Sequence, residues 1–248
     1  LALGSVERTL RTAAPAGPAF EAAQIRCGMR AADGAIEAVR IADDALELQV
    51  IGDVEPTGIC GSGLVDAVAE LLGAGLLDLT GRFVPNEIAS DVAPALAGRL
   101  TARADGERVF VLHWSEREGD VERAIYLSQR DVRELQFAKA SIATGWAVLA
   151  EELGVQASDI QQVLLAGSFG SYLSPASAIR IGLVPRLGLT RIISAGNVAG
   201  EGAKMTLLSM QERHGASAMA DQVAYIELSD REDFNDLFLE RLAFPALD

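Results

Sequence analysis

The segment from Gly58 to Gly63 is the first place where this sequence could hold a phosphate or a sugar. Three glycines within six residues let backbone N–H groups approach a ligand, and a helix that starts there adds unpaired donors and a favourable dipole. An ordinary tight turn has the same composition, and no lysine follows as it would in a P-loop. The segment reads Gly58-Ile59-Cys60-Gly61-Ser62-Gly63.

A second glycine segment follows the short apolar run from Val163 to Ala166. An unalternated apolar run is typical of a strand buried on both faces of a parallel sheet, and ligands bind at the carboxyl ends of such strands. A nucleobase or sugar could lie on the glycine backbone, with Phe169 or Tyr172 beside it. The alternative is a strand-to-helix turn that carries a core aromatic side chain. The segment reads Gly167-Ser168-Phe169-Gly170.

The third segment begins with Gly196 and Asn197 and continues into a helix that opens with small residues. Close helix packing explains the small residues at 199, 200, 202 and 203. Asn197 at the turn and Glu201 in the first helical turn are the polar groups that packing leaves unexplained. The repeated order of strand, glycine turn and helix is typical of nucleotide-binding folds.

Other kinds of reactive site find little support. Cys27 and Cys60 are the only cysteines, too few for a disulfide framework, a four-thiolate iron–sulfur cluster or a Cys-rich zinc site. Either could be redox-sensitive, but buried free cysteines are common. His113 and His214 have no partners at metal-binding spacing, and no Ser/His/Asp grouping stands out. We therefore predict no metal site and name no catalytic residue.

Two elements are expected to position the first glycine segment. Apolar residues on one helical face predict a helix over residues 62 to 72, with Ser62 as its N-cap and Gly73 near its end. Alternating apolar residues at 35–41 and 46–51 predict a β-hairpin that turns at Asp43 and Asp44.

The rest of the chain reads as helices and strands in alternation. Apolar positions three or four apart predict a long amphipathic helix from residue 131 to 153, which Gly154 ends. The other expected elements are strands at 109–112, 124–127, 163–166, 191–195 and 223–228 and helices at 199–210 and 233–242.

This pattern predicts an α/β fold in which helices flank a mixed sheet. Residues 78–128 have mixed polarity with prolines and glycines, so we expect an inserted smaller α+β segment there. Residues 129–212 would form the nucleotide-facing core of a single domain spanning residues 1–248.

Composition limits the possible partners. The chain has 248 residues, a formal net charge of −14 and an isoelectric point near 4.6, which argues against a nucleic-acid or anionic-membrane surface. No apolar run approaches the roughly 18 to 20 residues of a membrane span, and we expect a cytoplasmic protein. Because the chain opens on an apolar, strand-like stretch at Leu1, we also expect a fragment of a longer protein.

Taken together, these segments resemble the C-terminal domain of the reductive activators of corrinoid proteins, members of the acetate and sugar kinase/Hsp70/actin (ASKHA) superfamily. The order and spacing of the matches run through nearly the whole chain. They are Ala16-Gly17-Pro18-Ala19-Phe20-Glu21, Ile25-Arg26-Cys27-Gly28-Met29-Arg30-Ala31-Ala32, Gly58 to Asp66, Asp131-Val132-Arg133-Glu134-Leu135-Gln136 with Ala138-Lys139-Ala140, Leu164 to Gly170, and Gly196 to Gly200.

The resemblance implies a ribonuclease H-like ASKHA ATPase domain, with ATP in a cleft between two related domains. Gly167, Ser168, Phe169 and Gly170 then look like the adenosine motif. The helix after Gly196 and Asn197 looks like the second connection between the domains. The glycines at 58, 61 and 63 with Ser62 and Asp66 look like a further part of the cleft wall.

The resemblance also implies what lies elsewhere. The aspartate loops that hold Mg-ATP and a ferredoxin-like domain with a [2Fe–2S] cluster would precede Leu1, so this chain would be inactive alone. ATP would help drive a Co(II) to Co(I) reduction on a partner corrinoid protein. The alternatives are a related ATPase that activates another radical or dehydratase enzyme, and a non-catalytic interaction or dimerisation module. A homodimer is plausible.

Overall fold

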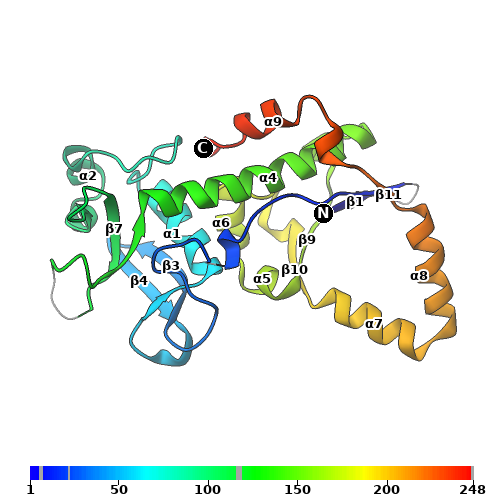
Figure 1. The fold of residues 1–248 in the computed structure, drawn as a ribbon, viewed down its shortest axis with the longest axis horizontal. Helices are drawn as coiled ribbons and strands as arrows, with labels where there is room; N and C mark the ends of the chain where they lie inside the picture. The colour runs from blue at the N-terminus through cyan, green and yellow to red at the C-terminus, as the bar shows by residue number, and fades with distance from the viewer. Residues whose placement is uncertain (6–7, 22, 116–118, 247–248) are drawn as a thin grey trace.

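The long helix α4 (Gln129–Leu153) organises the fold. The computed structural model describes residues 1–5, 8–21, 23–115 and 119–246, apart from the side chain of residue 168. In Figure 1, α4 crosses most of the molecule, with α9 on one side of it and α1, α5 and α6 on the other. The other helices are α1 (Gly61–Gly73), α2 (Asn86–Val92), α3 (Pro94–Ala97), α5 (Gly167–Tyr172), α6 (Pro175–Arg180), α7 (Val198–Leu208), α8 (Met210–Gln222) and α9 (Phe234–Glu240).

The strands of the described residues form four small sheets, ordered β1-β2-β11, β4-β3-β5, β6-β7-β8 and β9-β10. Parallel and antiparallel pairs both occur, which confirms the predicted α/β class. The strands are β1 (Ala2–Gly4), β2 (Thr9–Arg11), β3 (Ala35–Ala42), β4 (Ala45–Val50), β5 (Gly58–Ile59), β6 (Leu100–Ala102), β7 (Arg108–His113), β8 (Ile125–Ser128), β9 (Val163–Ala166), β10 (Ile192–Gly196) and β11 (Ala224–Tyr225).

The predicted hairpin is confirmed in β3 and β4. The two strands pair antiparallel, and Asp43 and Asp44 make the turn with positive φ angles of 49° and 62°. Aspartate is one of the few residues that tolerate this left-handed region. On its other edge, β3 pairs in parallel with β5, which begins at Gly58 and lies just before α1 in the chain. The hairpin sheet therefore sets the position of the α1 N-terminus.

Helix α1 forms as expected, but Ser62 is not its N-cap. The helix begins at Gly61, so Cys60 is the N-cap and Ser62 lies in the first turn. The Ser62 hydroxyl instead donates to the Glu37 carbonyl oxygen of β3 at 2.8 Å. A Cβ at Gly63 would overlap the carbonyl oxygen of Ile36. These contacts show that the first turn of α1 packs directly against β3. This packing between residues far apart in the sequence places the N-cap at Cys60 rather than at Ser62.

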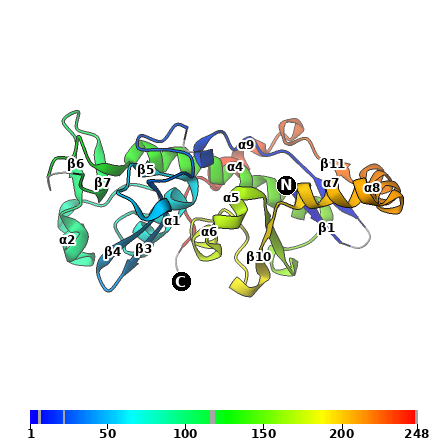
Figure 2. The same ribbon diagram turned by 90° about the horizontal axis from the view of Figure 1, so that it is seen from below.

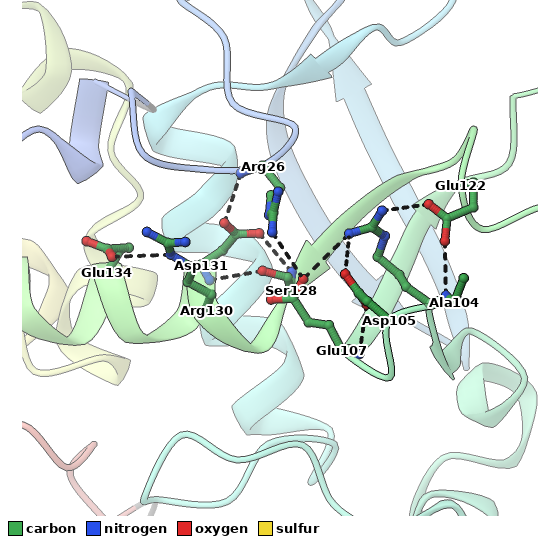
Figure 3. A network of polar contacts seen from close by, with 10 residues as sticks. Arg26, Ala104, Asp105, Glu107, Glu122, Ser128, Arg130, Asp131 and Glu134 are labelled. Carbon is green, nitrogen blue, oxygen red and sulfur yellow. Dashed lines mark hydrogen bonds and ion pairs between the residues drawn. The ribbon is translucent and has the colours of Figure 1, made fainter.

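Helix α4 starts at a capping box and ends at Gly154, whose φ of 68° places it in the left-handed region. The Asp131 backbone N–H donates to Ser128 Oγ at 3.2 Å, and the Ser128 N–H donates to Asp131 Oδ2 at 2.8 Å. Asp131 Oδ1 accepts a third bond, of 2.9 Å, from the Arg26 backbone N–H (Figure 3). The cap thus also anchors a distant loop.

Residues 78–128 form α2, α3 and the sheet β6-β7-β8. Within this segment, residues 116–118 are not described. Side chains such as Leu100, Phe110 and Leu127 join one buried cluster with residues of α1 and α4. The segment therefore shares the main core, and its status as an insertion stays a prediction.

Strands β9 and β10 pair in parallel as the strand–turn–helix pattern predicts. The expected burial of β9 on both faces is wrong, because Leu164 is 59% exposed. In β9, Leu164 and Ala166 are exposed while Val163 and Leu165 are partly buried, so this strand is covered on one face only.

The predicted helix at 199–210 is shorter than expected, and a second helix follows it. Ser209 has extended backbone angles that end α7 at Leu208, and its hydroxyl accepts from the Glu212 N–H to cap α8. Figure 1 shows α7 and α8 reaching away from the rest of the molecule, and in Figure 2 α8 lies at one end of it. Neither helix contains a buried residue.

The C-terminal elements are shorter than the periodicity suggests. The strand predicted at 223–228 is reduced to β11, and the last helix covers Phe234–Glu240 rather than 233–242. Among the described residues, no helix has the length and apolar character needed to cross a membrane.

Candidate functional site

A cavity of about 750 Å³ lies where the first two glycine segments meet. One wall is the N-terminal loop (residues 19–21 and 23–31), which contributes Phe20, Glu21, Met29, Arg30 and Ala31. The opposite side contains Cys60, Gly61 and Ser62 at the start of α1, Phe169 and Tyr172 on α5, and Glu37 and Ile51 near the hairpin. Segments more than a hundred residues apart thus share one cavity.

Phe20 and Phe169 form the aromatic corner of this cavity. Their ring centroids are 4.9 Å apart, at an interplanar angle of 40°. Gly61 fits beneath them, since a Cβ there would overlap the Phe20 carbonyl oxygen and lie 3.1 Å from Phe169 Cε2. The glycine at 61 is therefore needed for close approach of α1 to both aromatic residues.

The start of α1 gives the cavity a positive end. The helix is 13 residues long, and its N-cap, Cys60, makes no side-chain capping hydrogen bond. The first N–H groups of a helix lack intrahelical partners, and the dipole there favours an anion. Cys60 Sγ lies 3.3 Å from Ser62 Oγ and donates to the Ile36 carbonyl oxygen at 3.4 Å. The cysteine is held as a packing group beside the cavity.

Three charged side chains of the cavity were not predicted as site residues: Glu21, Arg30 and Glu37. Glu37 Oε1 accepts from Gln49 Nε2 at 2.8 Å across the hairpin. Glu21 and Arg30 fall within the two N-terminal segments that carry the family resemblance, and this is the signal that could have found them. Glu37 has no such signal, because the sequence pattern places it at a solvent-facing position of an ordinary strand.

The second and third glycine segments lie side by side. Gly196 pairs with Ala166 across the parallel strands, so both turns sit at the same carboxyl edge. Gly167 and Gly196 have φ angles of +89° and +65°, and no heavy atom lies within 4 Å of the position that a Cβ would take on either. This edge offers open, positive-φ backbone.

Gly167 and Gly196 do not line the cavity, and Phe169 and Tyr172 of α5 connect that edge to it. Asn197 caps α7, with Oδ1 accepting from the Gly200 N–H at 3.0 Å. A Cβ at Gly170 would lie 2.8 Å from the backbone of Leu165, so this glycine serves the turn. The Ser168 side chain lies outside the described part of the chain.

Gly58, Gly63 and Asp66 also lie outside the cavity lining. A Cβ at Gly58 would come within 2.7 Å of the Cys27 carbonyl oxygen, which makes this glycine another close-approach position. Asp66 is buried in α1, where burial raises the pKa of its carboxyl group despite hydrogen bonds from Ser177 and the Val39 backbone. The structure therefore brings together Gly61, Ser62 and Phe169 of the predicted site residues.

Cys27 is a half-buried thiol that donates to the Ala124 carbonyl oxygen at 3.9 Å. Burial raises its pKa, which favours the unreactive thiol form. It does not line the cavity. These features favour the packing interpretation over a redox role.

Known proteins resemble this chain along its whole length. The family described as the C-terminal domain of RACo, the ASKHA domain, matches residues 1–248. The corrinoid activation enzyme RamQ of Eubacterium limosum is 34% identical over 244 residues, which cover 98% of this chain and 41% of that protein. The Co(II) methylated amine-specific corrinoid protein reductase of Methanosarcina barkeri is 24% identical over 268 residues, which cover 98% and 44%.

A solved structure shares the fold as well. The reductive activator for a corrinoid, iron–sulfur protein superposes with a TM-score of 0.83 at 34% identity, covering 100% of this chain and 38% of that one. The chain thus spans about two fifths of the length of these relatives. Since the family match includes every residue, the chain belongs to the ASKHA domains that form the C-terminal part of the reductive activators of corrinoid proteins.

Proposed function

We propose that this domain forms one wall of the nucleotide site in an ATP-dependent reductive activator of a corrinoid protein. The full-length protein would couple ATP binding or hydrolysis to a Co(II) to Co(I) reduction. The electrons would come from a [2Fe–2S] cluster held by another part of that protein. The observation that carries the proposal is the cavity in which the α1 N-terminus meets Phe20 and Phe169.

The residues present fit a nucleotide. A volume of about 750 Å³ falls within the range of small-molecule sites, and aromatic faces beside a few polar groups suit a nucleoside. Phe169 and Tyr172 would hold the base, the carboxylates of Glu21 and Glu37 would bind hydroxyl groups, and the amides that start α1 would attract phosphate. ATP would supply the free energy that makes an unfavourable reduction possible.

The same residues show why this chain would be insufficient alone. Among the described residues of the lining, Arg30 is the only basic one, and the carboxylates of Glu21 and Glu37 oppose it. A triphosphate needs more positive charge than this, so we propose that Mg²⁺ and further phosphate ligands come from another part of the full-length protein. Closure of that part over the cavity would exclude water and change the grip on the corrinoid protein. We place this activity in the cytoplasm.

Titration of ADP into the full-length protein by calorimetry tests the proposal. Phe169→Ala should weaken ADP binding by the equivalent of about 1–3 kcal/mol, the usual value of base–aromatic stacking. Phe137→Ala is the matched control, because Phe137 lies on α4 and stacks on Phe238. Absence of saturable binding to the wild-type protein, or equal losses in both variants, would contradict the proposal.

One observation favours a second role, dimerisation or docking through α7 and α8. These helices expose several large apolar side chains, among them Leu207 at 75% and Leu208 at 85%. Exposed apolar clusters mark interaction sites. Leu208→Glu should leave the melting temperature unchanged while lowering the sedimentation mass of the full-length protein. An unchanged mass would reject this role in self-association.

A further inference from the structure

A second cavity lies away from the candidate nucleotide site. It has a volume of about 930 Å³, and residues of α4 and α6, Gly73 at the end of α1, the segment 182–189 and the C-terminal residues 240–246 line it. It shares no lining residue with the cavity at the start of α1. The proposed nucleotide function therefore leaves this cavity unexplained.

One face of α4 forms the floor of this cavity. Lys139, Ala143 and Trp146 are spaced at i, i+4 and i+7, so they project from the same side of the helix. The small Ala143 leaves a hollow between the two large side chains. Phe244 from the C-terminal segment completes an aromatic and aliphatic lining together with Val184 and Leu187.

Basic side chains dominate the charge of the cavity. Among the described residues that line it, Lys139, Arg180, Arg186 and Arg241 are basic and Glu240 is acidic; Glu70, outside the lining, pairs with Arg180 at 2.7 Å. This is the reverse of the chain as a whole, which has 35 acidic and 21 basic residues. A local excess of positive charge inside an acidic domain requires a specific explanation.

Lys139 is the most unusual of these groups. It is 2% exposed, its ammonium donates to the Ala243 carbonyl oxygen at 2.5 Å, and it lies 5.0 Å from the Phe244 ring centroid. No carboxylate forms an ion pair with Lys139 among the ion pairs of the described residues. Burial, and then the neighbouring Arg241, lower its pKa to about 8. A buried ammonium with a cation as its charged neighbour is a site that an anion would stabilise.

Trp146, another lining residue, has a buried polar atom without a partner in the described part of the chain. Trp146 Nε1 is shielded from water and has no hydrogen-bond acceptor among the described residues. Buried donors are nearly always paired, and each exception requires an explanation. An acceptor atom on a ligand would satisfy it if the indole ring turned toward the cavity.

We propose that this cavity binds a small organic anion with a flat apolar body. Its carboxylate would pair with Lys139 and Arg241, and its ring would lie over Ala143 against Trp146 and Phe244. The cavity volume suits a ligand of that size. Aromatic and cationic side chains in one concave site recognise such acids through charge at one end and packing at the other.

The wild-type full-length protein provides the first test. The probe is 2-naphthoate, its neutral counterpart is 2-naphthalenemethanol, and inorganic phosphate represents the charge alone. Titrations are run with saturating ADP so that the nucleotide cavity is filled. We expect saturable binding of one 2-naphthoate, at least about tenfold tighter than either of the other two, the effect of a charged hydrogen bond. Equal binding of the alcohol, displacement by ADP, or no binding would overturn the proposal.

The two lysines of this chain provide a matched pair of variants. Lys139→Met should weaken 2-naphthoate binding about tenfold or more. Lys204→Met, on the exposed surface of α7, removes the same charge and should leave binding unchanged. Equal affinities in the two variants would overturn the proposal. If Lys139→Met fails to fold, the comparison of naphthoate with its alcohol on the wild-type protein decides alone.

Discussion

Replacing Asp131 by alanine should loosen the wall of the candidate nucleotide cavity from a distance. The Asp131 carboxylate accepts hydrogen bonds from two backbone N–H groups, those of Ser128 and Arg26. The bond from the Ser128 N–H caps the N-terminus of α4. The bond from the Arg26 N–H fixes the N-terminal loop, which supplies Phe20 and Arg30 to the cavity. In Figure 3 this carboxylate is the junction between the two elements.

The magnitude follows from which donors lose their acceptor. Ser128 is fully buried, so its N–H would remain unpaired, whereas the Arg26 N–H is partly accessible to water. An orphaned buried donor costs about 1–3 kcal/mol and an accessible one less, which gives about 2–4 kcal/mol for the pair. Burial raises the pKa of Asp131, so loss of its charge offsets a small part of this cost. For a domain of this size, the melting temperature should fall by about 4–16 °C.

The assay combines a thermal melt of the full-length protein with a calorimetric titration of ADP. Asp131→Ala should lower the melting temperature and, at a temperature where it remains folded, weaken ADP binding several-fold. Asp159→Ala is the control, because Asp159 accepts a similar bond from the Gln156 N–H at 2.8 Å but is exposed. Stability loss with unchanged ADP affinity would refute the link between the α4 cap and the cavity. Equal losses in the two variants would refute the burial argument.

Two further substitutions test the close packing of α1 and its buried carboxylate. Gly61→Ala should destabilise the domain by about 1–3 kcal/mol through overpacking against Phe20 and should weaken ADP binding. Gly98→Ala, for which no described atom beyond the chain neighbours lies within 4 Å of the new Cβ, should change stability by no more than about 0.5 kcal/mol; urea titrations measure both stability changes. Burial raises the pKa of Asp66 above 3.8, so the wild-type protein loses stability as the pH rises through the raised value. The stability of Asp66→Asn relative to wild type should therefore increase between about pH 4 and pH 7, and thermal melts that show a constant difference would reject this assignment.

Local patterns were enough to predict the elements that carry the glycine segments. The hairpin at Asp43 and Asp44, the long helix that Gly154 ends, and the parallel strands before Gly167 and Gly196 all follow from periodicity and turn residues. Helix α8 was not predicted, because its exposed residues show no apolar periodicity. The shift of the α1 cap from Ser62 to Cys60 depends on contacts with β3, which local sequence does not reveal.

The candidate site was predicted only in part, for a related reason. Gly61, Ser62 and Phe169 of the cavity lining were among the predicted residues, because a glycine turn before a helix can be recognised from the sequence alone. The carboxylate of Glu37 reaches the cavity only through the pairing of β3 with β4 and β5. The same limit applies to the Arg26–Asp131 contact, which joins residues 105 positions apart.

Photoaffinity labelling with 2-azido-ADP tests the central claim most directly, because it locates the bound nucleotide. Labelled full-length protein would be digested and the modified peptides identified by mass spectrometry. We predict labels on peptides that contain Phe20, Arg30, Phe169 or Tyr172, and their loss when excess ADP competes. Competable labels confined to the cavity around Lys139 and Trp146, or found nowhere in this domain, would contradict the assignment of the nucleotide site.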